Sequence, residues 1–257
     1  MSALISPAEL QKILHQPDVK ILDASYGLPP SSQGIPGVVD FDIDDVADPD
    51  ASFAHTIPTA DIFADKLGNR GIGNDDLVIV YDRNGLAMAA ARAWWLFRLF
   101  GHSKVKVLNG GLPAWTRAGG AVMEKSAGVS TPAPFEASFK ADLFKSLDQI
   151  EENMHTKNFT LLDARDAGRY GGKPPNGHIP GSLNIPFFSL LNPDGTLQSP
   201  ENLEKIFLAA AVPLQDTLAC SCGSGVTACV VALALHELGR KNVAVYDGSW
   251  TEWSMRT

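Results

Sequence analysis

A cysteine at the end of an apolar run is the residue of this chain best suited to nucleophilic chemistry. Cys222 follows the run 218–221 and opens the loop 223–227, which leads into apolar residues at helical spacing. A thiol in such a loop lies among amide N–H groups at the positive end of a helix dipole, which favours the nucleophilic thiolate. Gly223 and Gly225 allow the backbone to bend around the sulfur. The loop therefore predicts a cysteine nucleophile in a cradle of backbone amides.

The other two cysteines fit a structural role. Cys220 lies inside the apolar run and Cys229 inside the expected helix, where thiols are usually small buried hydrophobes. The chain has no CxxC pair and no cysteine–histidine cluster with zinc spacing, so we expect no disulfide framework, metal or organic cofactor. Free thiols fit the reducing cytoplasm, where we expect the protein to act.

Composition excludes several classes of protein. The net charge of −8 over 257 residues, without a basic run, argues against nucleic-acid binding. No apolar stretch approaches the roughly 20 residues of a membrane span, and the first ten residues do not resemble a signal peptide. We expect a monomer that does not bind nucleic acid or membranes.

The elements that position Cys222 belong to an internal repeat. Segments that recur in the same order are 6–10 and 146–150, 21–24 and 161–164, 35–37 and 179–181, 76–82 and 216–222, and 105–111 and 243–249. In each copy short apolar strands alternate with amphipathic helices, which predicts an α/β fold with a mostly parallel sheet flanked by helices. We expect domains at 1–120 and 146–257, joined by a Pro- and Ser-containing linker at 121–145. Ser6 and Ser146 are the expected N-caps of the first helix of each copy.

The two copies differ at the reactive position. Asp82 stands where the second copy has Cys222, and Arg83 stands opposite Gly223. A carboxylate cannot replace a thiolate as a sulfur nucleophile. The first copy is therefore expected to keep the fold and to lack the chemistry.

These motifs resemble a known family. The loop 222–227, the segment Gly177-His178-Ile179-Pro180-Gly181-Ser182 and the segment Tyr246-Asp247-Gly248-Ser249-Trp250 are similar to those of the two-domain rhodanese family of sulfurtransferases. The loop looks like the 3-mercaptopyruvate sulfurtransferase branch, since the thiosulfate branch has basic residues where Gly223 and Ser224 stand. The resemblance implies that sulfur passes from 3-mercaptopyruvate through a Cys222 persulfide to a thiol, thioredoxin or cyanide, with release of pyruvate.

The resemblance also implies substrate-binding residues. Arg169 lies in a segment, 163–170, similar to the family's Asp-x-Arg-x-x-Gly-Arg-Tyr motif, and it would bind the donor's anionic group. The backbone of Gly223, Gly225, Val226 and Thr227 would hold the donor and stabilise its negative charge. Relatives usually carry a second arginine in a longer loop, where this chain has only Lys173. We expect Arg165 to be structural, paired with a nearby acid.

A proton relay is implied at three further positions. Ser224 looks like the family's loop serine, and Asp44 and His55 match the spacing of its aspartate and histidine partners in the first copy. Such a relay would protonate the pyruvate enolate or deprotonate the incoming thiol. His178 is expected to make a structural hydrogen bond instead.

Three other functions compete with sulfur transfer from 3-mercaptopyruvate. A cysteine phosphatase or arsenate reductase needs Cys-x5-Arg, and the residue six positions after Cys222 is Ala228, which excludes that class. Thiosulfate sulfurtransferase activity stays open, because loop amides can bind an anion without a cation. A non-catalytic sulfur-carrier or regulatory module also stays open.

Overall fold

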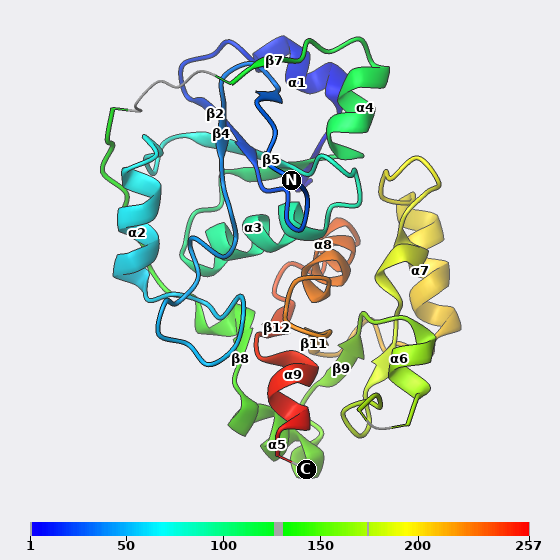
Figure 1. Ribbon diagram of the computed structural model, residues 1–257. Coiled ribbons are helices and arrows are strands. Elements are labelled where there is room, and N and C mark those ends of the chain that lie inside the picture. The colour runs from blue at the N-terminus through cyan, green and yellow to red at the C-terminus, as the bar shows by residue number, and fades with distance from the viewer. Residues whose placement is uncertain (1, 126–130, 174, 257) are drawn as a thin grey trace. The chain divides into compact units, whose positions relative to one another are not determined.

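The structure is a computed structural model that describes residues 2–125, 131–173 and 175–256 (Figure 1). The chain folds into two compact units. The first unit consists of Met1–Asp50, Ile57–Lys140 and Pro193–Thr196, and the second of Ala51–Thr56, Ala141–Asn192 and Leu197–Thr257. The two copies found in the sequence thus correspond largely to the two units.

The first unit is built on a parallel sheet. Its five strands lie in the order β1-β6-β5-β2-β4, and every neighbouring pair is parallel. The strands are β1 (Leu4–Ile5), β2 (Val19–Asp23), β4 (Val38–Asp40), β5 (Leu77–Tyr81) and β6 (Val105–Leu108). A separate antiparallel pair joins β3 (Gln33–Gly34) to β7 (Met123–Glu124). The helices are α1 (Pro7–Ile13), α2 (Ala60–Gly68), α3 (Met88–Leu99) and α4 (Gly111–Arg117).

The second unit repeats this topology. Its parallel sheet has the order β10-β9-β11-β12-β8, so each strand takes the place of its counterpart in the first sheet. The strands are β8 (Phe144–Lys145), β9 (Thr160–Asp163), β10 (Leu183–Asn184), β11 (Leu218–Ser221) and β12 (Ala244–Tyr246). The helices are α5 (Leu147–Thr156), α6 (Ala167–Gly171), α7 (Pro200–Ala209), α8 (Ala228–Glu237) and α9 (Ser249–Ser254), with 3-10 turns η1 (Ala141–Leu143) and η2 (Phe187–Leu190). The predicted fold class is confirmed.

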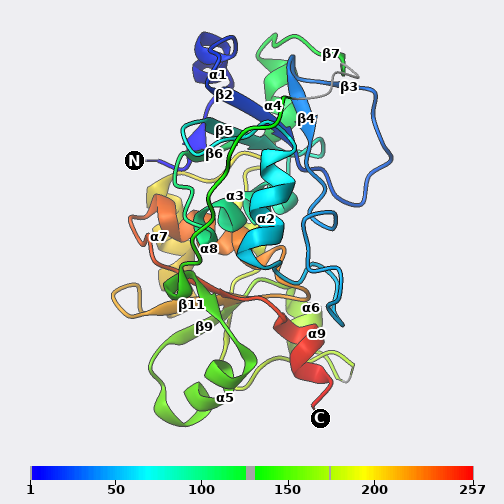
Figure 2. The same cartoon turned by 90° about the vertical axis from the view of Figure 1, so that its left-hand side faces the viewer.

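Helices pack on the sheets through apolar side chains. Leu10 of α1 and Trp115 of α4 share one apolar cluster with strand residues of the first sheet. In the second unit Ile150 of α5 joins the corresponding cluster, against which Trp253 of α9 packs. The course of both helices can be followed in Figures 1 and 2. Both expected N-caps are confirmed, since Ser6 and Ser146 each form a capping box with the third helical residue.

The sheet of the second unit places the reactive loop. β9 and β11 are hydrogen-bonded neighbours with Asp163 opposite Ser221, so Cys222 begins its loop beside the carboxyl end of β9. The carboxyl ends of neighbouring parallel strands are where open α/β sheets bind ligands. The helix predicted from Val226 onward begins at Ala228, because residues 222–227 form the loop and do not join the helix.

The segment predicted as a linker is divided between the units. Residues up to Lys140 belong to the first unit and residues from Ala141 to the second, while 126–130 lie outside the described residues. Residues 51–56, from the first sequence copy, belong to the second unit, and 193–196 belong to the first. The sequence repeat gives no sign of this exchange.

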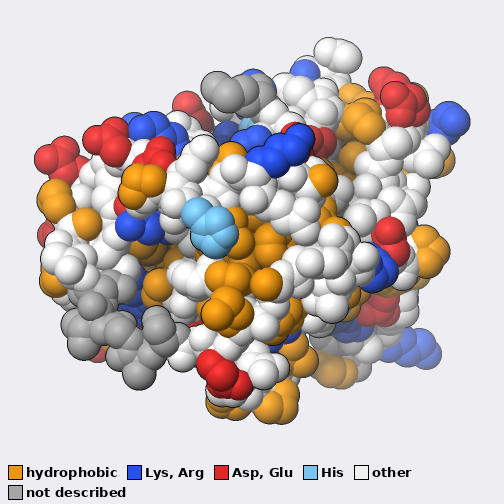
Figure 3. All heavy atoms as spheres, turned by 90° about the horizontal axis from the view of Figure 1, so that it is seen from above, with side chains coloured by type: hydrophobic (Ala, Val, Ile, Leu, Met, Phe, Trp, Pro, Cys, Tyr) orange, Lys and Arg blue, Asp and Glu red, His pale blue; other side chains and the backbone are white. Residues whose placement is uncertain are grey.

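The described helices are all too short or too polar to cross a membrane. On the face drawn in Figure 3, basic and acidic side chains are interspersed around apolar ones.

Candidate active site

The Cys222 loop presents backbone amide groups ahead of α8. Cys222 is almost completely buried, at 1% exposed, directly after β11. Gly225 has a φ of +77°, a left-handed conformation that glycine adopts without strain. Within the described residues the amides of Gly223, Ser224, Val226 and Thr227 donate no hydrogen bond. Unsatisfied N–H groups ahead of a helix can bind an anion, and binding by these amides stays a prediction.

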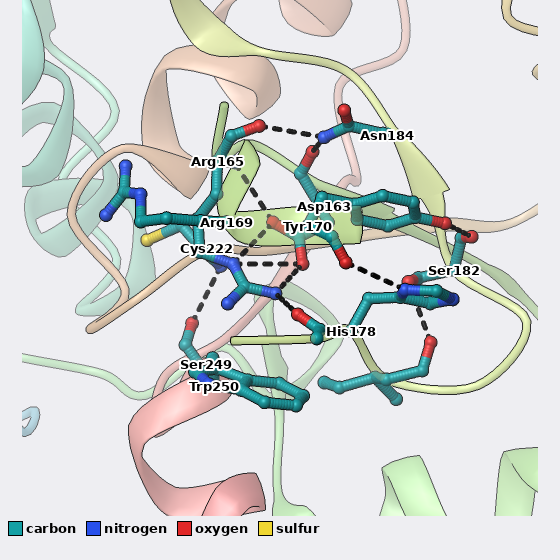
Figure 4. Close-up of polar contacts among 12 residues, drawn as sticks. Asp163, Arg165, Arg169, Tyr170, His178, Ser182, Asn184, Cys222, Ser249 and Trp250 are labelled. Atoms are coloured by element: carbon teal, nitrogen blue, oxygen red, sulfur yellow. Dashed lines mark hydrogen bonds and ion pairs between the residues drawn. The ribbon is translucent and has the colours of Figure 1, made fainter. Parts of the chain in front are cut away.

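The backbone of the loop is held by the start of α9. The amide of Trp250 donates to the carbonyl oxygen of Cys222 at 3.0 Å. Thr251 donates to the carbonyl of Gly223 twice, from its amide at 3.0 Å and from its hydroxyl at 2.8 Å. The amide of Cys222 itself donates to the hydroxyl of Ser249 at 3.0 Å (Figure 4). Sequence reasoning missed this role of α9, for which the only signal was Ser249 standing opposite Gly111 of the first copy.

Arg169 lies beside the reactive loop. A Cβ built on Gly223 would lie 4.0 Å from Nη1 of Arg169, so the guanidinium borders the loop. Its Nε is paired with Asp166 at 2.5 Å, and this hydrogen bond holds the pKa of Asp166 below its usual range. Within the described residues the two terminal nitrogens of Arg169 make no hydrogen bond, and the side chain is 51% exposed. The outer edge of the fork is therefore available to a carboxylate.

Arg165 is the buried counterpart of Arg169. Its side chain is 2% exposed, and two of its nitrogens bind the carboxylate of Asp163 at 2.6–3.2 Å. Nη2 also donates to the carbonyl of Gly177 at 2.7 Å, and the guanidinium lies 4.7 Å from the ring centroid of Trp250. Arg165 thus ties β9 to α9 beneath the reactive loop, as Figure 4 shows. It pairs with an acid as the sequence predicted.

The other two thiols are buried under the loop. Cys229, at the start of α8, donates from Sγ to the carbonyl of Gly225 at 3.2 Å. Burial raises the pKa of the Cys220 thiol well above its usual value, and the nearby sulfurs of Cys229 and Cys222 add to this effect. Cys220 therefore remains a neutral thiol at physiological pH.

The relay predicted from Ser224, His55 and Asp44 is not tested by the described contacts. The hydroxyl of Ser224, which is partly buried, makes no hydrogen bond within the described residues. His55 is 6% exposed and has a left-handed φ of +64°, and its segment 51–56 belongs to the second unit together with Ser224. Asp44 belongs to the first unit. The relay therefore stays a prediction.

His178 makes the expected structural contacts. Its Nδ1 lies 2.9 Å from the carbonyl oxygen of Tyr170, and its ring stacks on that of Tyr170 with centroids 4.1 Å apart. Lys173, the cation nearest to the position of the family's second arginine, is exposed. Its neighbour Pro174 lies outside the described residues.

The first unit has a carboxyl group, that of Asp82, at the position of the reactive thiol. Asp82 follows β5 as Cys222 follows β11, and its Oδ1 accepts the amide of Ala90 in α3 at 2.7 Å. Asp82 is 2% exposed, and burial raises the pKa of its carboxyl to about 7. The carboxylate occupies the position from which the Cys222 side chain extends in the second unit, as predicted from the repeat.

Comparison with known proteins decides the family. The family model of the rhodanese-like domain matches residues 6–118 and again 146–256. The chain belongs to the two-domain rhodanese family. This rhodanese is 41% identical to the thiosulfate sulfurtransferase of Rattus norvegicus over 93% of its own length and 86% of the relative's. It is 38% identical to the 3-mercaptopyruvate sulfurtransferase of Homo sapiens over 99% and 92% of the two chains.

A solved structure shows the same fold. The crystal structure of SseA from Escherichia coli, described as a 3-mercaptopyruvate sulfotransferase, superposes with a TM-score of 0.89 at 33% identity. The match covers 97% of this rhodanese and 99% of that chain. The predicted resemblance to the family and to its 3-mercaptopyruvate branch is thus confirmed.

Proposed function

We propose that this rhodanese transfers the sulfur of 3-mercaptopyruvate through a persulfide on Cys222 to a thiol acceptor. The observation that carries the proposal is the Cys222 loop itself. Within the described residues the amides of Gly223, Ser224, Val226 and Thr227 donate no hydrogen bond. Gly223 and Ser224 supply no cation, and the fork of Arg169 borders Gly223. A neutral amide cradle beside one guanidinium suits a donor with a single carboxylate. The relatives and the solved structure that carry the 3-mercaptopyruvate name match nearly the whole chain.

In the first step the donor loses its sulfur to Cys222. Arg169 binds the carboxylate of 3-mercaptopyruvate, and the Cys222 thiolate attacks the donor's sulfur atom. The S–S bond forms as the C–S bond breaks, and the electron pair of the C–S bond remains on carbon as the enolate of pyruvate. The amides of the loop stabilise the negative charge that develops. Protonation of the enolate yields pyruvate, and Ser224, His55 and Asp44 are proposed to supply that proton.

In the second step an external thiolate or cyanide attacks the outer sulfur of the persulfide. The S–S bond of the persulfide breaks and Cys222 leaves as the thiolate, ready for another cycle. A small thiol or a dithiol of the thioredoxin class would serve as acceptor. A reducing compartment such as the cytoplasm fits three free cysteines, because an oxidised Cys222 could not take up sulfur.

Thiosulfate is the second candidate donor. The chain is 41% identical to a thiosulfate sulfurtransferase, and it lacks the second arginine that would favour mercaptopyruvate. Amides that bind a carboxylate-bearing donor can also bind a sulfonate group. A non-catalytic sulfur-carrier role is the third candidate, which the intact loop argues against.

Paired steady-state assays on one preparation, with cyanide as acceptor, test these alternatives. Pyruvate release from 3-mercaptopyruvate is compared with thiocyanate formation from thiosulfate, with Cys222→Ser as the control. A higher kcat/KM for 3-mercaptopyruvate than for thiosulfate supports the proposal. A higher kcat/KM for thiosulfate would make thiosulfate the donor. Turnover of neither, with sulfur still retained on Cys222, would support the carrier role.

A further inference from the structure

Ser249 is a fully buried serine whose hydroxyl has a completely defined hydrogen-bonding role. Its Oγ donates to the carbonyl oxygen of Tyr246 at 2.8 Å and accepts the amide of Cys222 at 3.0 Å. A hydroxyl has one proton to donate, so the bond to Tyr246 turns a lone pair toward the amide of Cys222. Ser249 is 0% exposed, so no water competes for either bond. The peptide from which the Cys222 side chain extends is therefore fixed at its nitrogen.

The backbone of Ser249 is strained for a residue with a side chain. Its φ is +53°, in the left-handed region that disfavours residues with a Cβ. Gly111, the counterpart of Ser249 in the first unit, has nearly the same φ, +55°. The next residue makes the same bond in both units, since Leu112 donates to the carbonyl of Asp82 and Trp250 to that of Cys222, each at 3.0 Å. Glycine is therefore sufficient to form this turn.

Gly111 and Ser249 can therefore be compared as equivalent positions of the two units. The first unit, which has Asp82 in place of the cysteine, keeps the unstrained glycine, and a Cβ there would lie 2.3 Å from the carbonyl oxygen of Asp82. The second unit accepts the strain and gains a hydroxyl aimed at the amide of Cys222. Strain retained at one of two equivalent turns points to a function of the added group.

We propose that Ser249 is a positioning residue for sulfur transfer, which holds the Cys222 peptide so that the sulfur sits correctly in the loop. The inference rests on the proposed function, in which Cys222 is the nucleophile. Ser249 touches neither donor nor acceptor and acts only through Cys222. Because the amide of Cys222 donates to Ser249, it is not available to the substrate. The negative charge that develops in the reaction is therefore stabilised by the amides of the residues after Cys222.

Two substitutions separate positioning from stability. Ser249→Gly removes the hydroxyl and relieves the strain, as at Gly111, whereas Ser249→Ala removes the hydroxyl and keeps the strain. Ser182→Ala is the matched control, because Ser182 is buried and its Oγ also donates to a carbonyl three residues earlier, that of Ile179, at 2.7 Å. The readouts are Tm, kcat and KM with 3-mercaptopyruvate, and the rate at which iodoacetamide alkylates Cys222, followed by peptide mass spectrometry.

Both Ser249 variants are expected to lose kcat by about tenfold to a hundredfold, the cost of a misplaced reacting atom, with little change in KM. Alkylation of Cys222 at neutral pH is expected to slow in both. Ser249→Gly should match or exceed Ser249→Ala in Tm, because it relieves the strain. An equal loss of kcat in the two variants then separates the effect on rate from the effect on stability. Ser182→Ala should lower Tm and leave kcat unchanged.

Wild-type kcat and alkylation in Ser249→Gly would overturn the inference. A rate that simply follows Tm across all three variants would also overturn it, because that is the behaviour of a structural residue. If the wild-type protein released no pyruvate from 3-mercaptopyruvate, the proposed function would fail, while the alkylation rates would still test whether Ser249 positions Cys222.

Discussion

Replacing Arg169 by alanine tests how the donor is held. The side chain borders Gly223 and presents two terminal nitrogens without a described partner, but it is 51% exposed. A hydrogen bond to a charged group contributes about 1.5–3 kcal/mol, and solvent screening at a half-exposed site favours the lower half of this range. Since about 1.4 kcal/mol corresponds to a factor of ten, kcat/KM for 3-mercaptopyruvate should fall by about ten- to thirtyfold. Most of the loss should appear in KM, because the carboxylate does not change charge in the reaction.

Steady-state pyruvate release measures this effect, and two further variants calibrate it. Arg169→Lys keeps the charge and loses the planar fork, so its kcat/KM should lie between those of wild type and Arg169→Ala. Asp166→Asn removes the charged partner of Nε and retains a side chain able to cap α6, so kcat/KM should change by less than about threefold. A kcat/KM in Arg169→Ala equal to that of wild type would refute the assignment of Arg169 to the donor's carboxylate.

Four further substitutions test the buried charges and the relay. The pKa of Asp82 is raised to about 7 from 3.8, so the folded state holds a proton that the unfolded state releases, and stability falls as pH rises from about 4 to 7. In urea titrations over this pH range the free energy of unfolding of Asp82→Asn should fall by up to about 4 kcal/mol less than that of wild type. An equal dependence of the free energy of unfolding on pH in the two proteins would contradict the burial argument. Arg165→Met should lower the free energy of unfolding by about 3–5 kcal/mol, because it leaves the carboxylate of Asp163 buried without its partner, and a loss below about 1 kcal/mol would contradict this. Ser224→Ala and His55→Ala should each reduce kcat by about a hundredfold without adding in the double variant, and additive losses would argue against a shared relay.

The fold could be predicted from the sequence because it is encoded twice. The recurrence of short apolar strands at the same spacing fixed the strand-for-strand correspondence that the two sheets show. Helix caps and the reactive position could also be predicted, because they depend on residues that are close together in the sequence. Ser6 and Ser146 form the capping boxes expected of them, and Asp82 follows β5 as Cys222 follows β11.

Long-range contacts could not be predicted in the same way. Ser249 and Cys222 are 27 residues apart in the sequence, and nothing in the type of either residue indicates a bond between hydroxyl and amide. The assignment of segment 51–56 to the second unit depends on tertiary packing that a repeat conceals. The later start of α8 has a local cause, because the apolar pattern includes Val226 but the loop amides before Ala228 are turned out of the helix.

The central claim is that Cys222 carries the transferred sulfur. The most direct measurement is mass spectrometry of the protein after reaction with one equivalent of 3-mercaptopyruvate in the absence of an acceptor. We expect the peptide that contains Cys222 to gain the mass of one sulfur atom, one pyruvate to be released per chain, and cyanide to remove the added sulfur as thiocyanate. Sulfur found on Cys220 or Cys229 instead, or undiminished pyruvate release by Cys222→Ser, would contradict the account.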